Sequence, residues 1–161
     1  RGPCQCGSLI AGASENELET VGSFGEAVGI GFQVRDDLLN LTEESETEAP
    51  SACAGGYGKE RGGDIAEGKR TLITIELLER LSEKNAERVR SILLETREQI
   101  PESDIDWCIV QAESTGALNA AANYCHEQAK LASAALEKLP NQHVSSLLGE
   151  LVDYLTIDRK A

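Results

Sequence analysis

Apolar residues recur at helical spacing near the start of the chain. The repeat comprises Leu18, Val21, Phe24, Val28 and Phe32. Steps of three and four residues are the period of one helix face, and Ser14 with Glu17 has the spacing of a capping box, which marks a helix start. The pattern predicts a long helix from about Glu15 to Leu41, preceded by the end of another helix at Cys6 to Ala11.

Four glycines lie inside this predicted long helix: Gly22, Gly25, Gly29 and Gly31. Glycine costs up to about 1 kcal/mol relative to alanine in a helix interior. Their presence predicts that a neighbouring backbone or a ligand comes close to this helix.

The helical period is lost between Thr42 and Gly68. This stretch holds an acidic tract from Glu43 to Glu48, then Pro50 and a glycine-rich sequence. We expect one long loop over the whole stretch, of the kind that is usually functional or disordered.

Helical patterns resume at Thr71. The first has Leu72, Ile75, Leu78 and Leu81, and the second has Val89, Ile92, Leu93 and Thr96. After Pro101 comes a long helical segment from Ser103 to Leu139, in which Gly116 predicts a kink or break. A last helix is expected from Val144 to Leu155. No stretch alternates as a strand does, so the predicted fold is all-α.

The chain is strongly acidic. Its 161 residues carry 28 Asp and Glu against 15 Lys and Arg, a formal net charge of −13. Such a field repels nucleic acid and anionic membranes, so we expect no nucleic-acid partner. An anionic ligand then needs a basic pocket or a metal.

A membrane span or a secretion signal in the sequence would indicate cellular location. No run of 18 apolar residues indicates a membrane span, and no secretion signal is visible, which predicts a cytoplasmic address. A sequence that opens with Arg1 and contains no Met is expected to be a segment of a longer protein.

Oxygen-bearing side chains gather near the end of the predicted long helix. Gln33, the adjacent pair Asp36 and Asp37, and Asn40 are three or four residues apart, so they share one helix face. Neighbouring carboxylates repel each other when ionised, and oxygen ligands suit a hard cation such as Mg²⁺. The alternative is a solvated polar face.

Basic residues and glycines alternate in the second half of the predicted loop. The cations are Lys59, Arg61, Lys69 and Arg70, interleaved with Gly58, Gly62, Gly63 and Gly68. Glycines let the backbone approach a ligand, and cations near a metal cluster suit a phosphate or diphosphate. Gly63 to Lys69 also matches the start of a P-loop, but Arg70 replaces the magnesium-binding Ser or Thr and no hydrophobic strand precedes the motif. We therefore exclude a nucleotide-binding P-loop.

Two motifs together resemble those of a known enzyme family. The first is FQVRDD at residues 32–37, and the second is GKERGGDIAEGKRT at residues 58–71. Their pairing, FQxxDD with GKxxGxDxxxGKxT, resembles the trans-isoprenyl diphosphate synthases, which make geranyl, farnesyl and geranylgeranyl diphosphates. By this resemblance, residues 1–161 correspond to the C-terminal half of an isoprenoid synthase domain.

The resemblance implies a fold and a reaction. The fold is an all-α barrel of helices, with Mg²⁺ ions holding an allylic diphosphate in its cavity. The reaction is ionisation of the allylic diphosphate, attack by the double bond of isopentenyl diphosphate, and loss of a proton.

The resemblance also implies roles for single residues. The metal ligands would be Asp36 and Asp37, with Asn40 in the motif's third acidic position and Asp64 acting through water or by orienting Lys59. The catalytic residues would be Gln33, beside the reacting carbons, and Lys59 and Lys69, which would hold the diphosphate.

Two departures from the family pattern matter. Asn40 stands where the motif often has a third Asp, and this DDxxN form resembles some geranylgeranyl synthases, which favours that product. The family's first aspartate-rich motif does not occur in the sequence. Asp36 and Asp37 alone are then too few ligands to bind Mg²⁺ tightly, because Mg²⁺ sheds its water reluctantly. We expect the 161 residues alone to be an incomplete catalyst and the full-length protein, a homodimer by resemblance, to be active.

Two other functions stay open. One is a noncatalytic subunit that modulates a synthase partner, and the other is a terpene cyclase with the same helical architecture. Retention of Asp36, Asp37, Lys59 and Lys69 argues against the first, because a regulatory subunit has no physical need for a metal and diphosphate site. The second motif argues against the cyclase, whose metal motifs normally differ.

Overall fold

The computed structural model of the protein describes residues 1–42 and 61–158. Within these ranges the chain forms helices and no strand, which confirms the predicted all-α class. Contacts divide the chain into two compact units, one built from Arg1–Arg35 with Ala122–Lys160 and the other from Asp36–Ala121. Helices α2 (Glu15–Thr42) and α7 (Ala117–Leu136) each contribute to both. None of the described helices has the length and apolar character needed to cross a membrane.

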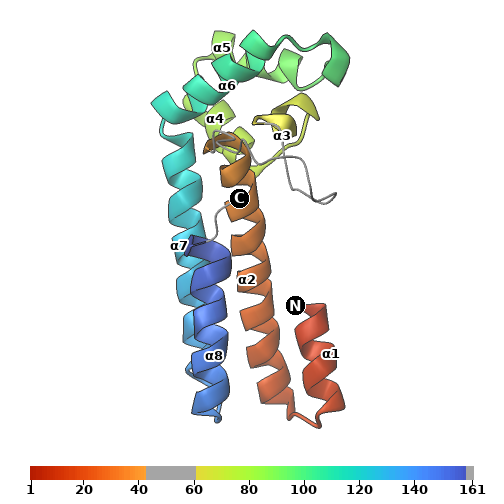
Figure 1. Ribbon diagram of the computed structural model, residues 1–161, viewed down its shortest axis with the longest axis vertical. Coiled ribbons are helices and arrows are strands. Elements are labelled where there is room, and N and C mark those ends of the chain that lie inside the picture. Colours follow the sequence, from red (N-terminus) through yellow and green to blue (C-terminus); the bar gives the residue numbers. More distant parts are fainter. Residues whose placement is uncertain (43–60, 159–161) are drawn as a thin grey trace, which may run out of the picture. The chain divides into compact units, whose positions relative to one another are not determined.

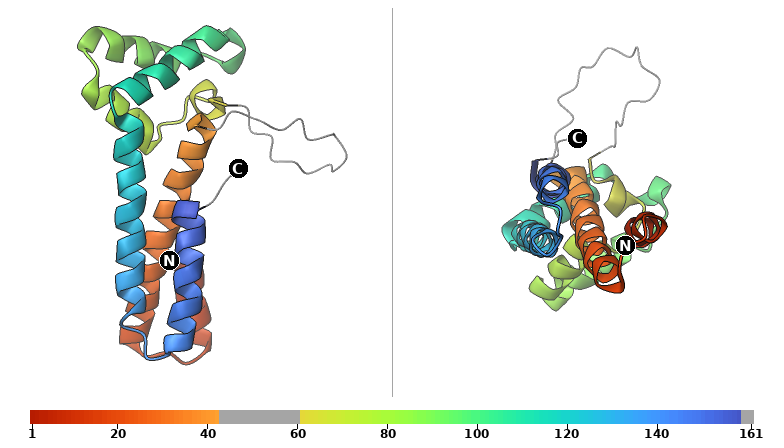
Figure 2. Two further views of the ribbon diagram at one scale, coloured as in Figure 1. Left: turned by 60° about the vertical axis from the view of Figure 1, so that its left-hand side comes forward. Right: turned by 90° about the horizontal axis from the view of Figure 1, so that it is seen from below.

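The first unit packs two further helices against parts of α2 and α7. Helix α1 (Gly2–Ile10) lies along the start of α2, and α8 (Gln142–Asp153), which continues into the π-helical turn η2 (Tyr154–Asp158), runs beside α7 (Figures 1 and 2). The buried cluster consists of Phe24, Ala27, Val28, Ala129, Ala132, Ala135, Leu136 and Val152. Half of these side chains are alanines, which allow the helix backbones to approach closely.

The glycines of α2 confirm this close approach at most of their positions. A Cβ on Gly25 would lie 2.7 Å from the Cys4 Sγ, and one on Gly31 would lie 2.9 Å from the Thr156 Cγ2. Gly29 is different, because nothing lies within 4 Å of its Cβ position. The expectation of a close neighbour was therefore wrong at Gly29.

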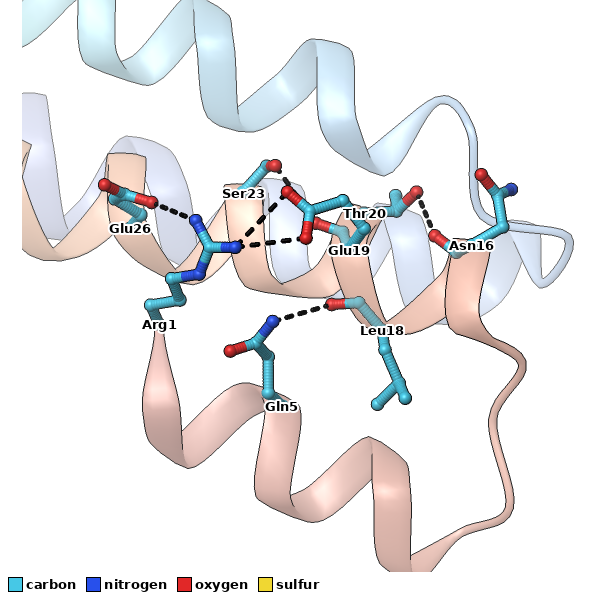
Figure 3. A network of polar contacts seen from close by, with 8 residues as sticks. All are labelled: Arg1, Gln5, Asn16, Leu18, Glu19, Thr20, Ser23 and Glu26. Carbon is cyan, nitrogen blue, oxygen red and sulfur yellow. Dashed lines mark hydrogen bonds and ion pairs between the residues drawn. The ribbon is translucent and has the colours of Figure 1, made fainter.

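Polar contacts tie α1 to α2 on the surface of the first unit (Figure 3). Arg1 donates to Glu26 at 2.8 Å and to Glu19 at 3.0 Å, and the Gln5 amide donates to the Leu18 carbonyl at 3.4 Å. The hydrogen bond with Glu26, followed by the charge of Glu19, raises the pKa of Arg1. Exposed pairs of this kind add little stability, so they fix the orientation of α1 more than they strengthen the unit.

The capping box at the start of α2 is confirmed. The Ser14 backbone N–H donates to the Glu17 carboxylate at 2.8 Å, and the Glu17 N–H donates to the Ser14 hydroxyl at 3.4 Å. The hydrogen bond that the Ser14 hydroxyl donates to the Glu17 carboxylate at 2.7 Å, followed by the one from the Ser14 N–H, lowers the pKa of Glu17. The sequence signal therefore marked the helix start correctly.

The second unit contains the remaining short helices. They are α3 (Gly63–Ala66), α4 (Leu72–Arg80), α5 (Glu83–Ile92), the 3₁₀ turn η1 (Arg97–Gln99) and α6 (Glu102–Ser114). The predicted break at Gly116 is confirmed, because its φ of +77° separates α6 from α7. A residue with a side chain rarely adopts that backbone conformation.

Two expectations for the second unit were wrong. The stretch before Gly68 is not loop throughout, because α3 occupies part of it; four residues are too few for a helical period to show. In α4 the buried residues are Ile73, Thr74 and Leu77, whereas Ile75 of the predicted stripe is 49% exposed. The sequence of α4 has apolar residues on more than one face. The neighbouring helices, and not the helical period, therefore determine which face is buried.

Candidate functional site

All four predicted metal ligands lie in the second unit, near the end of α2 and the start of α3. Asp37, Asn40 and Asp64 are buried, with 8%, 6% and 7% of their surface exposed, while Asp36 is half-buried. Buried carboxylates in proteins are normally paired or bind a metal. The buried carboxylates of this site therefore need a positive partner, either a basic side chain or a bound cation.

Hydrogen bonds join the end of α2 directly to the start of α3. The Asn40 carbonyl accepts the Gly62 N–H at 2.9 Å, and the Asn40 side-chain oxygen accepts the Asp64 N–H at 3.1 Å. The Arg61 Nε donates to the Leu41 carbonyl at 3.1 Å. A basic group there is favourable, because the last carbonyls of a helix carry partial negative charge.

Helix α3 ends in a Schellman motif, which determines where Lys69 lies. The Lys69 N–H donates to the Asp64 carbonyl and the Gly68 N–H to the Ile65 carbonyl, both at 2.9 Å. This pattern needs a left-handed residue after the helix, and Gly68 supplies it with a φ of +66°. A Cβ on Gly68 would also lie only 2.6 Å from the Leu93 carbonyl oxygen. The glycine therefore folds the chain back so that Lys69 returns to the start of α3.

Lys69 forms an ion pair with Asp64 across this turn. Its Nζ lies 2.6 Å from the Asp64 Oδ1 and 3.0 Å from the Glu67 Oε2. The hydrogen bond with Asp64, followed by the one with Glu67, raises the pKa of Lys69, so the ammonium stays charged. An ammonium has three donors, so these two contacts leave capacity for a third acceptor.

The threonine of the second motif begins the next helix. The Thr71 hydroxyl accepts the Thr74 N–H at 3.3 Å and thereby caps α4. The Thr74 hydroxyl in turn donates to the Lys69 carbonyl at 3.4 Å. The backbone on both sides of Lys69 is therefore held by hydrogen bonds.

One small cavity in the second unit connects these elements. Asp37, Asp64, Thr71 and Thr74 form its polar lining, and the remaining walls are mostly apolar side chains of α4, α5 and α6. The cavity has a volume of about 20 Å³, which is room for about one water molecule, so a diphosphate would have to bind outside it.

The donor set partly fits a divalent cation of the Mg²⁺ type. Mg²⁺ prefers oxygen ligands and is commonly bound through one or two carboxylates together with substrate phosphates and water. Asp36 and Asp37 offer such carboxylates. Within residues 1–42 and 61–158, no group of three or more His, Cys, Asp or Glu side chains forms a closed metal site. The fit is therefore to a cation shared with an anionic ligand.

The structure brings several of the predicted residues into contact. Asn40, Asp64 and Lys69 are in contact, and Asp37 shares the cavity with Asp64. Gln33 is exposed on α2, one helical turn before Asp36 and Asp37, and Lys59 lies outside the described residues. The assigned roles of all these residues stay predictions.

Sequence reasoning missed two contributors to this site, Glu67 and Thr74, and it named Arg61 as a cation without predicting its contact with the Leu41 carbonyl. It did not predict that Asp64 pairs with Lys69; the expected roles of Asp64, supporting the metal through water or orienting Lys59, stay predictions. Gly68 is compatible with the glycine that ends a helix in a Schellman motif, but the helix before it is too short to show a period.

A family model for polyprenyl synthetases matches residues 1–111. A short chain isoprenyl diphosphate synthase of Methanothermobacter thermautotrophicus is 30% identical over 151 residues, which cover 94% of this chain and 42% of that protein. The chain therefore spans less than half the length of this relative.

Solved structures give the same result for the fold. A polyprenyl synthase of Caulobacter crescentus, complexed with calcium and isoprenyl diphosphate, has a TM-score of 0.79 at 28% identity and covers 98% of this chain and 44% of its own. A geranylgeranyl pyrophosphate synthase of Corynebacterium glutamicum, complexed with isoprenyl diphosphate and magnesium, has a TM-score of 0.76 at 27% identity, with 93% and 40% covered. The motif resemblance is thus confirmed over most of the chain, which belongs to the polyprenyl synthetase family.

Proposed function

We propose that the protein containing this chain is a trans-prenyltransferase that condenses isopentenyl diphosphate with an allylic diphosphate. The observation that carries the proposal is the Asp64–Lys69 pair, held by the Schellman motif beside the cavity that Asp37 also lines. The DDxxN form of the first motif favours a geranylgeranyl product. A cytoplasmic address and a homodimer of the full-length protein stay predictions.

The chain's own residues would act on the leaving diphosphate. Lys69 stays charged and donates its remaining N–H to a diphosphate oxygen, and Lys59 is proposed to do the same. Both contacts strengthen as the carbon–oxygen bond breaks and negative charge gathers on the leaving group. Gln33 would direct its side-chain carbonyl dipole toward the allylic cation that forms.

Asp36 and Asp37 would hold Mg²⁺, with Asp64 supporting the site through its pairing with Lys69. A bound Mg²⁺ would neutralise diphosphate charge and so make the leaving group better. The solved relatives contain calcium or magnesium together with isoprenyl diphosphate, which supports this use of a divalent cation.

The test uses the full-length protein with C5 and allylic substrates and measures product formation against Mg²⁺ concentration. Asp36→Ala and Lys69→Ala are each expected to lower kcat/KM by about 100-fold or more, because each removes charge stabilisation that acts in the transition state. Asp106→Ala and Lys84→Ala are matched controls on exposed positions of α6 and α5, and we expect wild-type activity from both.

The alternatives give different results in the same assay. A noncatalytic subunit would show no turnover of its own, and Asp36→Ala would leave the chemistry of its catalytic partner intact. A terpene cyclase would consume the allylic diphosphate without isopentenyl diphosphate. Either result would contradict the proposed condensation.

A further inference from the structure

Helix α3 starts without a cap of its own. Its N-cap is Gly62, which has a φ of +77° and no side chain to accept a hydrogen bond from the first turn. The first N–H groups of a helix have no partner inside that helix and must be satisfied from elsewhere. A buried helix start of this kind needs an acceptor from another part of the chain.

Asn40 supplies that acceptor from α2. Its side-chain oxygen accepts the Asp64 N–H at 3.1 Å, and its carbonyl accepts the Gly62 N–H at 2.9 Å. Asn40 itself is only 6% exposed. Losing this acceptor would leave a buried N–H unsatisfied, which is unfavourable. One residue of α2 therefore caps a helix that lies more than twenty positions later in the chain.

The cap controls the position of the charged pair, because Asp64 is both the capped residue and the partner of Lys69. The path runs from the Asn40 oxygen to the Asp64 backbone, and from the Asp64 carboxylate to the Lys69 ammonium at 2.6 Å. A shift of the α3 start would move both the carboxylate in the cavity and the lysine.

We infer that Asn40 is a positioning residue, which holds the Asp64–Lys69 pair in place, and that its side chain is not a ligand of the divalent cation. The inference rests on the proposed function for its kinetic consequences only. It gives a physical reason for a side-chain oxygen at residue 40, where the family's motif often has a third Asp.

The test compares Asn40→Ala, Asn40→Asp and the control Asn141→Ala in the full-length protein. Asn141 caps α8 through the Val144 N–H at 3.3 Å, so its replacement also removes an asparagine cap, in the other unit. Asn40→Asp keeps an acceptor for the Asp64 N–H and adds the charge that a metal ligand would use.

Amide hydrogen exchange of Asp64 reports on the cap without any assay of activity. We expect exchange at Asp64 to become about tenfold faster in Asn40→Ala, as follows from one unsatisfied buried N–H. Exchange should stay near the wild-type rate in Asn40→Asp and Asn141→Ala. In the kinetic assay, Asn40→Ala should raise KM for the allylic diphosphate, and Asn40→Asp should restore it.

The Mg²⁺ dependence separates positioning from ligation. If Asn40 were a ligand, the carboxylate of Asn40→Asp would lower the Mg²⁺ concentration for half-maximal activity by about tenfold or more; a positioning residue leaves it within a few-fold of wild type. A tenfold fall, or unchanged Asp64 exchange in Asn40→Ala, would overturn the inference. If Asn40→Ala does not fold, the Mg²⁺ dependence of Asn40→Asp decides.

The two proposals fail in distinguishable ways. Absence of turnover in every form of the protein, including the wild type, would count against the proposed function. The exchange rates at Asp64 would still decide whether Asn40 caps α3.

Discussion

Gly68 has a backbone conformation and surroundings that disfavour any side chain. The residue has a φ of +66°, and a Cβ would meet the Leu93 carbonyl oxygen at 2.6 Å. A left-handed backbone costs a residue with a side chain about 1–3 kcal/mol, and a backbone oxygen cannot move aside as a side-chain end can. We expect Gly68→Ala to lower the free energy of unfolding in urea by about 2 kcal/mol or more.

Gly29 provides the matched control for that substitution. It lies in the interior of α2, its φ is not positive, and nothing lies within 4 Å of its Cβ position. Alanine favours a helix interior by up to about 1 kcal/mol over glycine, so Gly29→Ala should leave the stability unchanged or increase it. Equal destabilisation by both substitutions would show that the Gly68 turn is not strained by a side chain.

The buried thiol of Cys108 makes the stability of the second unit depend on pH. It is 1% exposed, and burial, followed by the charge of Asp104, raises the pKa of its thiol from 9.0 to about 11. As the pH rises above 9.0, the unfolded thiol loses its proton while the folded thiol keeps it. The unfolded state is then favoured, so stability falls between pH 9.0 and about 11.

The measurement is the free energy of unfolding against pH for the wild type, Cys108→Ala and Cys6→Ala. We expect the alkaline loss to be smaller in Cys108→Ala than in the wild type. Cys6 is exposed, so its replacement should leave the pH profile as it is. Identical profiles for all three proteins would contradict a perturbed thiol at position 108.

Sequence motifs predicted which residues gather at the site better than how they contact each other. The spacing of Asp37 and Asn40 on one helix face follows from the helical period alone. The Asp64–Lys69 pair does not, because it depends on the left-handed turn at Gly68. Whether a glycine adopts that conformation depends on its surroundings in the folded protein. Here the Leu93 carbonyl leaves no room for a side chain, and no local sequence pattern contains that information.

Between elements, one cation–π contact joins α5 to α6. The Arg88 guanidinium lies 3.9 Å from the ring centroid of Trp107 and donates to Asp104 at 2.6 Å. Such contacts contribute about 0.5–1 kcal/mol at exposed positions. We expect Arg88→Ala to lower the free energy of unfolding by about 1 kcal/mol and to shift the emission of Trp107, the single tryptophan of the chain.

Arg80 is the control for this contact. It pairs with Glu76 within α4 at 2.6 Å, and an exposed pair one helical turn apart contributes about 0.2–0.5 kcal/mol. Arg80→Ala should therefore have a smaller effect on stability and leave the tryptophan emission unchanged. An emission shift of equal size in both variants would mean that Trp107 does not report on Arg88.

Long elements were predictable because their period and end signals agree. The α2 start, the break at Gly116 and the separation at Pro101 each rest on a local signal that the structure confirms. Helix α3 was missed because four residues form barely one turn and both flanks are glycine-rich. Contacts distant in sequence help to hold this helix, among them the cap from Asn40, and a pattern along the chain cannot show these.

At the scale of the whole molecule, an apolar stripe on α8 governs how the purified chain behaves. Val144, Leu147, Leu151 and Tyr154 follow at helical spacing and are 40%, 60%, 43% and 60% exposed. A contiguous exposed stripe of this kind favours association. We expect the 161-residue chain, studied by itself, to associate with rising concentration in sedimentation velocity experiments, and Leu147→Glu to reduce this.

The control replaces an exposed leucine elsewhere. Leu94 is 76% exposed in the second unit, outside α8. Leu94→Glu adds the same negative charge as Leu147→Glu and should leave association unchanged. Equal suppression by both variants would attribute the effect to net charge and not to the stripe.

Catalysis also depends on how much of the family's fold is present. The chain spans 42% of the short-chain synthase that it matches over 151 residues, and among its described residues no group of three or more potential ligands closes around a cation. Mg²⁺ sheds its water reluctantly, so one or two carboxylates hold it weakly unless other groups contribute. We predict that the 161 residues alone do not condense isopentenyl and allylic diphosphates at saturating Mg²⁺, whereas the full-length protein does so under the same conditions. Product formed by the purified chain, and lost in its Asp36→Ala variant, would contradict this prediction and show that the site described above suffices, because only a cluster completed within these residues could then ionise the allylic substrate.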